Sequence, residues 1–268
     1  MWYGIVKMIN FGHGDVIMIG GYVLFSMIYG SGTNVFAALI VAMVVCTVLG
    51  VVIEKVAYKP LREASSLAVL ITAIGVSILL QNIAQLIFTS QPKMFRNPIK
   101  LGSVKMFGAN IEGSTILMIV LGIIIVVALS IFIRKTKTGR AMLAVSEDKD
   151  AAKLMGINVN TTITITFAIG SALAALASLL MFNAYPSLIP TSGSMPGIKA
   201  FVAAVFGGIG SIPGAMVGGI VLGIIEVLSG AYIPNGTKLA NAIVFVVLIV
   251  VLIFKPTGLF GKKIKEKV

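Results

Sequence analysis

Charge, cysteine and histidine are all scarce in this 268-residue chain. Only 11% of the residues are charged, and there is one cysteine and one histidine. Cys46 cannot form a disulfide within the chain, and its place in an apolar run predicts a small buried hydrophobic residue. The lone His13, with no cysteine cluster near it, argues against a metal site.

Motifs for catalysis are also lacking. The sequence contains no GxxxxGK[ST] phosphate-binding loop and no nucleophile at a recognisable spacing from a base. The first residues, "MWYGIVKMINFGHGD", have no long apolar stretch ahead of their polar residues, so we expect no cleavable signal peptide. The chain is predicted neither to hydrolyse ATP nor to catalyse a reaction.

Hydrophobic residues, in contrast, make up 58% of the chain, and the mean hydropathy is +1.06. Soluble domains are about 45–50% apolar, whereas each membrane-spanning helix needs about 20 apolar residues. Because lipid offers no partner for the backbone, unbroken apolar runs of this length are expected to be helices. We therefore predict an all-α, polytopic transmembrane helical bundle forming one domain over residues 1–268, with about six full spans plus short or re-entrant segments. The apolar runs are 15–30, 34–53, 66–88, 114–133, 161–182, 198–230 (interrupted) and 237–254.

The net charge of +12 indicates membrane orientation rather than nucleic-acid binding, because Lys and Arg gather in particular loops. Loops 54–65 and 134–160 and the tail from Lys255 are the basic segments, and we expect all three on the cytoplasmic side. Residues 91–114 are then external although they also carry basic residues. Proline, glycine and alternating residues in this loop predict a small hairpin.

The region 198–230 must cross the membrane an even number of times if loop 134–160 and the tail lie on one side. Two full spans with a loop need about 40 residues, so a pair of short or re-entrant segments is predicted here. Their break falls in "FGGIGSIPGAMVGG" (206–219), and a second glycine-rich segment is "NFGHGDVIMIGG" (10–21). Interrupted segments of this kind line substrate paths in transporters.

Several polar and small residues in these segments are candidates for either a translocation path or a helix contact. Gly214 and Gly218 form a small-xxx-small pair, for which helix packing is favoured over a direct role with substrate. Glu226 either lines a path or is solvated near the outer boundary of the membrane. The full set is Asn10, His13, Asp15, Gln81, Asn82, Gly214, Gly218 and Glu226.

The segment "SEDKDAAKLMG" (146–156) is unusually rich in charge for this chain. It predicts one helix of about 9 residues, with a serine N-cap, acidic residues in its first turn, and a glycine stop. So short a helix does not persist alone in water, so it lies on the membrane or its own protein, or it docks a cytoplasmic subunit. The residues concerned are Ser146, Glu147, Asp148, Asp150, Ala151, Leu154, Met155 and Gly156.

Five segments together resemble the LivH family of branched-chain amino acid permeases, which belong to ABC importers. They follow the order of that family and cover nearly the whole chain. The segments are "YGIVKMINFGHGDVIMIGGY" (3–22), "AYKPLREASSLAVLITAIGVSILLQN" (57–82), "TGRAMLAVSEDKDAAKLMGIN" (138–158), "GGIGSIPGAMVGGIVLGIIE" (207–226) and "KPTGLFG" (255–261).

The resemblance implies an ABC importer permease fold in the bacterial cytoplasmic (inner) membrane. It also implies a homologous, LivM-like permease partner, two cytoplasmic ATP-binding subunits, and an external solute-binding protein that delivers leucine, isoleucine, valine or related amino acids. ATP and Mg²⁺ would bind the ATPases, and this chain would carry no cofactor. In the family the cytoplasmic loop carries the coupling helix, which corresponds to residues 146–156 within loop 134–160.

The start of the chain departs from the family pattern. Members usually have a further transmembrane helix ahead of the segment that matches 3–22, and we expect that helix to be missing here. Other functions stay open at this stage: a permease for another small solute such as a sugar or amide, an ATPase-independent channel or carrier, and a membrane scaffold.

Overall fold

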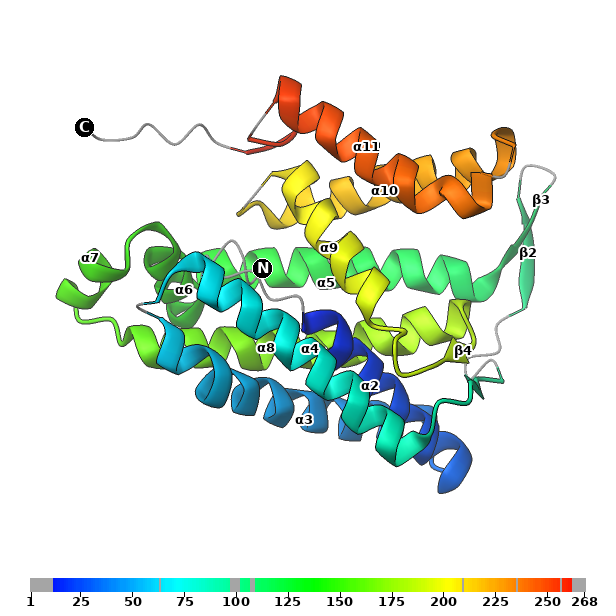
Figure 1. Ribbon diagram of the computed structural model, residues 1–268, viewed down its shortest axis with the longest axis horizontal. Coiled ribbons are helices and arrows are strands. Elements are labelled where there is room, and N and C mark those ends of the chain that lie inside the picture. Colours follow the sequence, from blue (N-terminus) through cyan, green and yellow to red (C-terminus); the bar gives the residue numbers. More distant parts are fainter. Residues whose placement is uncertain are drawn as a thin grey trace. The chain divides into compact units, whose positions relative to one another are not determined.

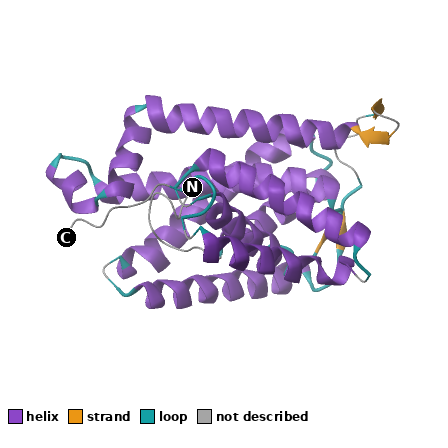
Figure 2. Cartoon of the chain, turned by 90° about the horizontal axis from the view of Figure 1, so that it is seen from above, coloured by secondary structure: helices purple, strands orange, loops and turns teal. Residues whose placement is uncertain are grey.

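The structure is a computed structural model that describes residues 12–62, 64–96, 102–106, 109–208, 210–234, 236–255 and 257–261. Helices dominate it, and its strands are few and short (Figure 2). Contacts along the chain separate two compact units, one up to Gly197 and one formed by Ile198–Val268, with the boundary inside helix α9. That residues 1–268 form one domain stays a prediction.

Six helices in the described part of the chain are long and apolar enough to cross a membrane. The prediction of an all-α, polytopic helical bundle with about six full spans is therefore confirmed. These helices are α3 (Val35–Ile53), α4 (Ser66–Phe88), α5 (Gly113–Lys135), α8 (Val159–Ala184), α10 (Ile212–Tyr232) and α11 (Gly236–Phe254), and α3 continues through the π-helix Glu54–Tyr58 into a short 3-10 turn, Lys59–Leu61.

The first apolar run forms a helix too short to span, followed by a π-helix. Helix α2 (His13–Phe25) is about 20 Å long at 1.5 Å per residue, and the chain continues as the π-helix Ser26–Gly30. Met18 and Tyr22 on α2 are completely buried. Within its unit α2 packs against α3, α4 and α8, so this short helix lies in the core rather than against lipid (Figure 1).

Glycines and small residues let the helices of this core approach closely. A side chain at Gly50 of α3 would collide with Ser171 of α8, and one at Gly21 of α2 would collide with the ring of Phe182. Cys46 is fully buried beside Gly20, as its sequence context predicted. Close backbone approach through small residues is the usual way helices associate in membranes.

The loops of the first unit fall into two sets at opposite ends of its helices. Strand β1 (Lys93–Met94) pairs with β4 (Ser187–Leu188), so the loops that follow α4 and α8 meet at one end. At the other end Arg62 hydrogen-bonds to Asn160, which brings loops 54–65 and 134–160 together as the orientation argument requires. Which end faces the cytoplasm stays a prediction.

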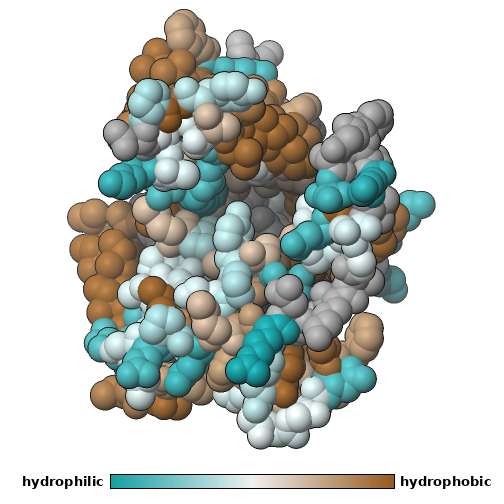
Figure 3. Space-filling view, turned by 90° about the vertical axis from the view of Figure 1, so that its right-hand side faces the viewer, coloured by the Kyte–Doolittle hydropathy of each residue, from teal (hydrophilic) through white to brown (hydrophobic). Residues whose placement is uncertain are grey.

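The predicted hairpin within residues 91–114 is present. Strands β2 (Ser103–Met106) and β3 (Ala109–Glu112) are antiparallel, with Ser103 opposite Glu112. In Figure 3, hydrophilic and hydrophobic residues both lie on the face toward the viewer, and the hydrophobic ones form continuous patches. Large apolar side chains such as Ile40, Leu86 and Phe254 are mostly exposed, as expected for side chains that meet lipid.

The prediction of two short segments over 198–230 is half wrong. Helix α9 (Ser194–Gly207) is short, about 21 Å, but α10 has 21 residues and is long enough to span. The break was placed correctly, since Gly208 and Gly210 have positive φ between the two helices. The length was underestimated because the turn takes few residues and α10 continues to Tyr232.

The unit of residues 198–268 has its own small hydrophobic core and a pinned tail. Val202 and Phe206 of α9 pack with Leu222 of α10 and Val244 of α11. Just after α11 the chain turns back, and the amides of Leu259 and Phe260 donate to the carbonyls of Phe206 and Gly207, each at 2.9 Å. The tail thereby satisfies carbonyls that the end of a helix would otherwise leave without partners.

Candidate functional site

The charged segment 146–156 forms parts of two helices rather than one. Helix α6 (Lys137–Glu147) follows α5 almost directly, and α7 (Lys149–Leu154) follows α6. Ser146 is therefore not an N-cap: it lies inside α6, and its hydroxyl donates to the carbonyl of Leu143 at 2.6 Å. The prediction of a single nine-residue helix is wrong because the helix begins earlier, where the Thr136 hydroxyl accepts from Gly139 N–H.

Asp148 takes the capping role that was predicted for Ser146. Its backbone is extended, which ends α6, and its carboxylate accepts from the amides of Asp150 and Ala151 at 2.8 and 3.0 Å. Aspartate is among the best N-cap residues and its charge suits the positive end of a helix, so it displaces the serine two residues earlier. Glu147 consequently ends α6 instead of opening the next helix.

Gly156 ends α7 as predicted. Its φ is +80°, and the amides of Gly156 and Ile157 donate to the carbonyls of Lys153 and Ala152. This pair of hydrogen bonds is the Schellman motif, which needs a residue that tolerates positive φ. Both ends of α7 are thus fixed by local contacts, which keeps a helix of only 6 residues in place.

Three apolar residues at the end of α7, Ala151, Leu154 and the C-cap Met155, point away from the protein. Leu154 is 89% exposed, Met155 is 83% exposed and Ala151 is exposed as well, whereas Ala152 is buried at 4%. Ala152 therefore holds the helix against its own unit and leaves the opposite face uncovered. Large apolar side chains that are exposed together and flanked by charges are typical of protein interaction sites.

A buried polar network lies beside this loop and was missed by the sequence analysis. Glu54 is fully buried, forms an ion pair with Arg62, and accepts a hydrogen bond from the Thr164 hydroxyl at 2.8 Å. Arg62 also donates to Asn160 in the first turn of α8. The network joins the end of α3 to the start of α8, and α8 begins only five residues after α7 ends.

Two of the polar candidates meet in the core of the first unit. The Asp15 carboxylate accepts from the Ser77 hydroxyl at 2.5 Å and from the Gln81 amide at 3.0 Å. Gln81 also donates to the hydroxyl of Ser194 at 2.9 Å. Asp15 has no exposed surface, so this cluster links α2, α4 and the first turn of α9 from within the bundle.

The backbones cross very closely next to this cluster. A side chain at Gly14 would collide with the Gly193 carbonyl and lie 2.8 Å from the Gly197 Cα, so only glycine fits there. His13 is half-buried at the start of α2. Asn82 faces away from the cluster, since it is exposed and donates to the Ile78 carbonyl of its own helix at 2.8 Å. Asn10 lies outside the described residues.

The structure places Gly214 and Gly218 at a close contact between α9 and α10. A side chain at Gly214 would lie 2.5 Å from the Gly207 carbonyl oxygen, and one at Gly218 would lie 2.9 Å from the Gly207 nitrogen and collide with the Ala203 carbonyl. Of the two roles considered for these glycines, helix packing and direct contact with substrate, this contact is helix packing. Gly223, five residues further along α10, has open space where its side chain would be.

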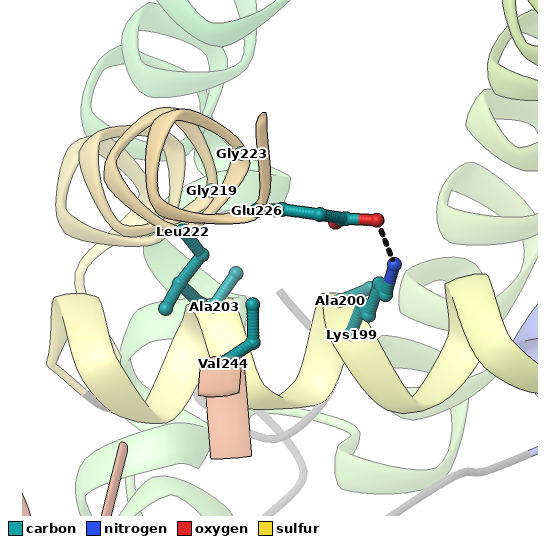
Figure 4. A pocket seen from close by; sticks show the side chains of 8 residues that line it. All are labelled: Lys199, Ala200, Ala203, Gly219, Leu222, Gly223, Glu226 and Val244. Carbon is teal, nitrogen blue, oxygen red and sulfur yellow. Dashed lines mark hydrogen bonds and ion pairs between the residues drawn. The ribbon is translucent and has the colours of Figure 1, made fainter. Parts of the chain in front are cut away.

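Glu226 forms an ion pair with a lysine that the sequence analysis passed over. The Lys199 ammonium of α9 donates to the Glu226 carboxylate at 2.6 Å, and the two side chains are 30% and 37% exposed (Figure 4). They border a pocket of about 210 Å³ that is otherwise lined by glycine, alanine, leucine and valine. Each of the two charges therefore has a partner of opposite sign beside the apolar lining of the pocket.

The missed residues carried a signal in the sequence. Lys199 is a lone charge within an apolar run, and an ionisable residue at membrane depth is expected to have a function or a partner. Ser77 stands four residues before Gln81, so both lie on one face of α4. For Arg62 and Glu54 the sequence shows only that both lie in loop 54–65, because their pairing depends on a turn of π-helix that periodicity does not reveal.

Known proteins are similar to this chain over its whole length. A family profile described as the permease component of the branched-chain amino acid transport system matches residues 1–252. Two relatives are high-affinity branched-chain amino acid transport system permease proteins. LivH of Salmonella typhimurium is 44% identical and covers 100% of this chain and 90% of its own. BraD of Pseudomonas aeruginosa is 41% identical and covers 100% and 91%.

A sugar permease is similar over a smaller part. The fructose import permease protein FrcC of Rhizobium meliloti is 31% identical over 112 residues, which is 40% of this chain and 31% of its own. No solved structure matches this chain significantly. The full-length matches and the six apolar helices agree with the segments quoted in the sequence, and the chain belongs to the family of permease components of branched-chain amino acid transport systems.

Proposed function

We propose that this chain is the membrane-spanning permease subunit of an ATP-driven ABC importer for branched-chain or related hydrophobic amino acids. It lies in the cytoplasmic membrane of a bacterium and pairs with a homologous, LivM-like permease subunit. Two cytoplasmic ATPases bind ATP and Mg²⁺, and an external solute-binding protein delivers the substrate. The chain itself carries no cofactor and catalyses no reaction.

The observation that carries the proposal is the exposed apolar face of α7. Leu154 and Met155 stand almost fully out of the protein, yet Asp148 and Gly156 fix the helix in one orientation. A helix whose backbone is already fixed loses less entropy on binding, so a surface of this kind suits a docked partner. A helix lying flat on its own protein would cover this face instead.

The same loop is placed to pass motion into the membrane. Helix α6 continues from α5 through a single residue, Thr136, and α7 leads to α8 through a short link. The Glu54–Arg62 pair then joins the start of α8 to the end of α3. A displacement of α7 by an ATPase would therefore move three spans together.

Leu154→Asp in the assembled transporter tests the docking face. Burying a leucine contributes about 1.5–3 kcal/mol, and each 1.4 kcal/mol is tenfold in affinity, so we expect docking to weaken by about 10–150-fold. The permease subunits should still insert and pair, while the ATPases are lost on purification and ATP-dependent leucine uptake into liposomes stops.

Lys153→Ala is the matched control, because Lys153 is an exposed neighbour on the same helix and lies outside the apolar face. It should keep both the ATPases and uptake. If Leu154→Asp also keeps them, α7 is only a surface helix. Uptake that proceeds without ATP in the unaltered protein would instead favour a carrier and reject the importer.

A further inference from the structure

The Lys199–Glu226 pair lies at a depth where unneeded charge is costly. Glu226 stands six residues before the end of α10, so it is about 9 Å inside a helix long enough to span the bilayer. Charged side chains at such positions face the interior of the bundle or an aqueous cavity, and they mark substrate pathways.

The walls of the neighbouring pocket are apolar and lie to one side of the pair. Leu222, Ala203 and Val244 form an aliphatic surface, and Gly219 and Gly223 leave room in front of it (Figure 4). The Lys199 and Glu226 side chains point toward each other along the edge of this surface. One ammonium, one carboxylate and an aliphatic wall therefore border the same space of about 210 Å³.

Helix packing alone does not account for this arrangement. The contact between α9 and α10 is already made by their backbones, through Gly207, Gly214 and Gly218. An ion pair that served only to join the helices would not need to border a space that a small molecule can enter. Here about a third of each charged side chain remains exposed beside an open pocket.

We propose that this pocket is a binding subsite for the amino-acid substrate itself within the permease. The substrate carboxylate pairs with Lys199, its ammonium pairs with Glu226, and its branched aliphatic side chain packs on Leu222 and Val244. This inference rests on the proposed function, because it assigns to that function a place where an aliphatic amino acid is held during passage.

When the substrate binds, Lys199 and Glu226 exchange each other for the substrate's charged groups, and every charge still has a partner of opposite sign. In the structure Lys199 and Glu226 neutralise each other at 2.6 Å. A zwitterion inserted between them replaces that one ion pair by two and brings one charge of each sign. A ligand with only one of the two charges would leave Lys199 or Glu226 without a partner at membrane depth, which is costly. The pair thus selects zwitterions over amines and carboxylic acids.

The site also implies a handedness that a packing role does not. An α-carbon held at its ammonium, its carboxylate and its side chain has three fixed attachments. Exchanging the lysine with the glutamate swaps two of these attachments while the aliphatic wall stays in place. The swapped site therefore fits the mirror image of the original ligand.

The test uses the complete transporter, with its ATPases and binding protein, reconstituted in liposomes. Glu226→Gln is expected to lower L-leucine uptake at least tenfold while all subunits still co-purify. Gly223→Leu fills the pocket and should have the same effect, because its new side chain meets open space and no backbone. Gly122→Leu is the matched control: a side chain at Gly122 on α5 also meets open space, so uptake should stay within twofold.

The double exchange, Lys199→Glu with Glu226→Lys, separates the two roles of the pair. If the pair only joins helices, the exchange restores L-leucine uptake, and the inference is overturned. We expect uptake to remain at least tenfold low. Saturation-transfer NMR on the assembled transporter, without binding protein, should show preference for L-leucine in the unaltered form and for D-leucine in the exchanged form.

The NMR measurement tests the subsite even if a variant fails to assemble. If the unaltered transporter gives no saturation-transfer signal from L-leucine, the subsite is refuted. Normal uptake by Gly223→Leu would refute it too. Failure of the proposed function is recognised separately, because the unaltered transporter would then show no ATP-driven uptake at all.

Discussion

Replacing Arg62 by methionine is expected to destabilise the protein strongly, because it strands a buried carboxylate. Glu54 has no exposed surface, and the Arg62 side chain is only 13% exposed. Without the guanidinium, Glu54 keeps the Thr164 hydroxyl at 2.8 Å as a hydrogen-bond partner but loses the one ion-pair partner that it has among the described residues. Breaking a buried ion pair by removing one partner costs about 3–5 kcal/mol.

The double variant Glu54→Gln with Arg62→Met shows whether charge is the cause. It removes both charges and keeps a side chain that can accept from Thr164, so most of the lost stability should return. Replacing a buried pair by neutral groups is often close to neutral. Lys55→Ala is the control, since Lys55 is the exposed neighbour of Glu54 on the same π-helix.

Unfolding in mixed micelles, titrated with a denaturing detergent, gives the free energy for each variant. The expected order is a large loss for Arg62→Met, a small loss for the double variant, and about 0.5 kcal/mol or less for Lys55→Ala. An Arg62→Met variant that unfolds at the same detergent concentration as Lys55→Ala would contradict this explanation. A double variant that is no more stable than the single one would contradict it as well.

Two further predictions concern packing and topology. Gly218→Leu should lower the free energy of unfolding by about 1–3 kcal/mol, because its side chain would meet the backbone of α9. Gly122→Leu should be tolerated, and equal free energies of unfolding for the two variants would contradict the close contact. A single cysteine at Asp150 should be labelled only from the cytoplasmic side of intact cells and one at Lys105 only from outside, and labelling of Asp150 from outside would reverse the assigned orientation and remove the docking proposal.

The sequence predicts those structural features that are determined by residues close together in the chain. Six spans follow from length and hydropathy, since the backbone of each is satisfied within its own segment. The stop at Gly156 is local as well, because the positive φ of a Schellman motif favours glycine. The hairpin in 91–114 was likewise visible from its turn residues and alternation.

Errors arose where two nearby residues competed or where distant ones met. Ser146 and Asp148 both suit an N-cap, and only the continuation of α6 from Thr136 decides between them. The contacts of Asp15 with Gln81, and of Lys199 with Glu226, join helices that periodicity treats separately. A lone charge such as Lys199 signals a partner, but the sequence does not identify it.

The pinned tail has a consequence for biosynthesis. The carbonyls of Phe206 and Gly207 at the end of α9 receive their hydrogen bonds from Leu259 and Phe260, about fifty residues later in the chain. Ribosomes add about 5–20 residues per second, so α9 waits about 3–10 s for the segment that completes its end. Helix α9 is thus made well before α10 and α11 but completed only after both. A nascent chain stalled inside α11 has Lys199 on a helix whose last carbonyls still lack these two hydrogen-bond donors.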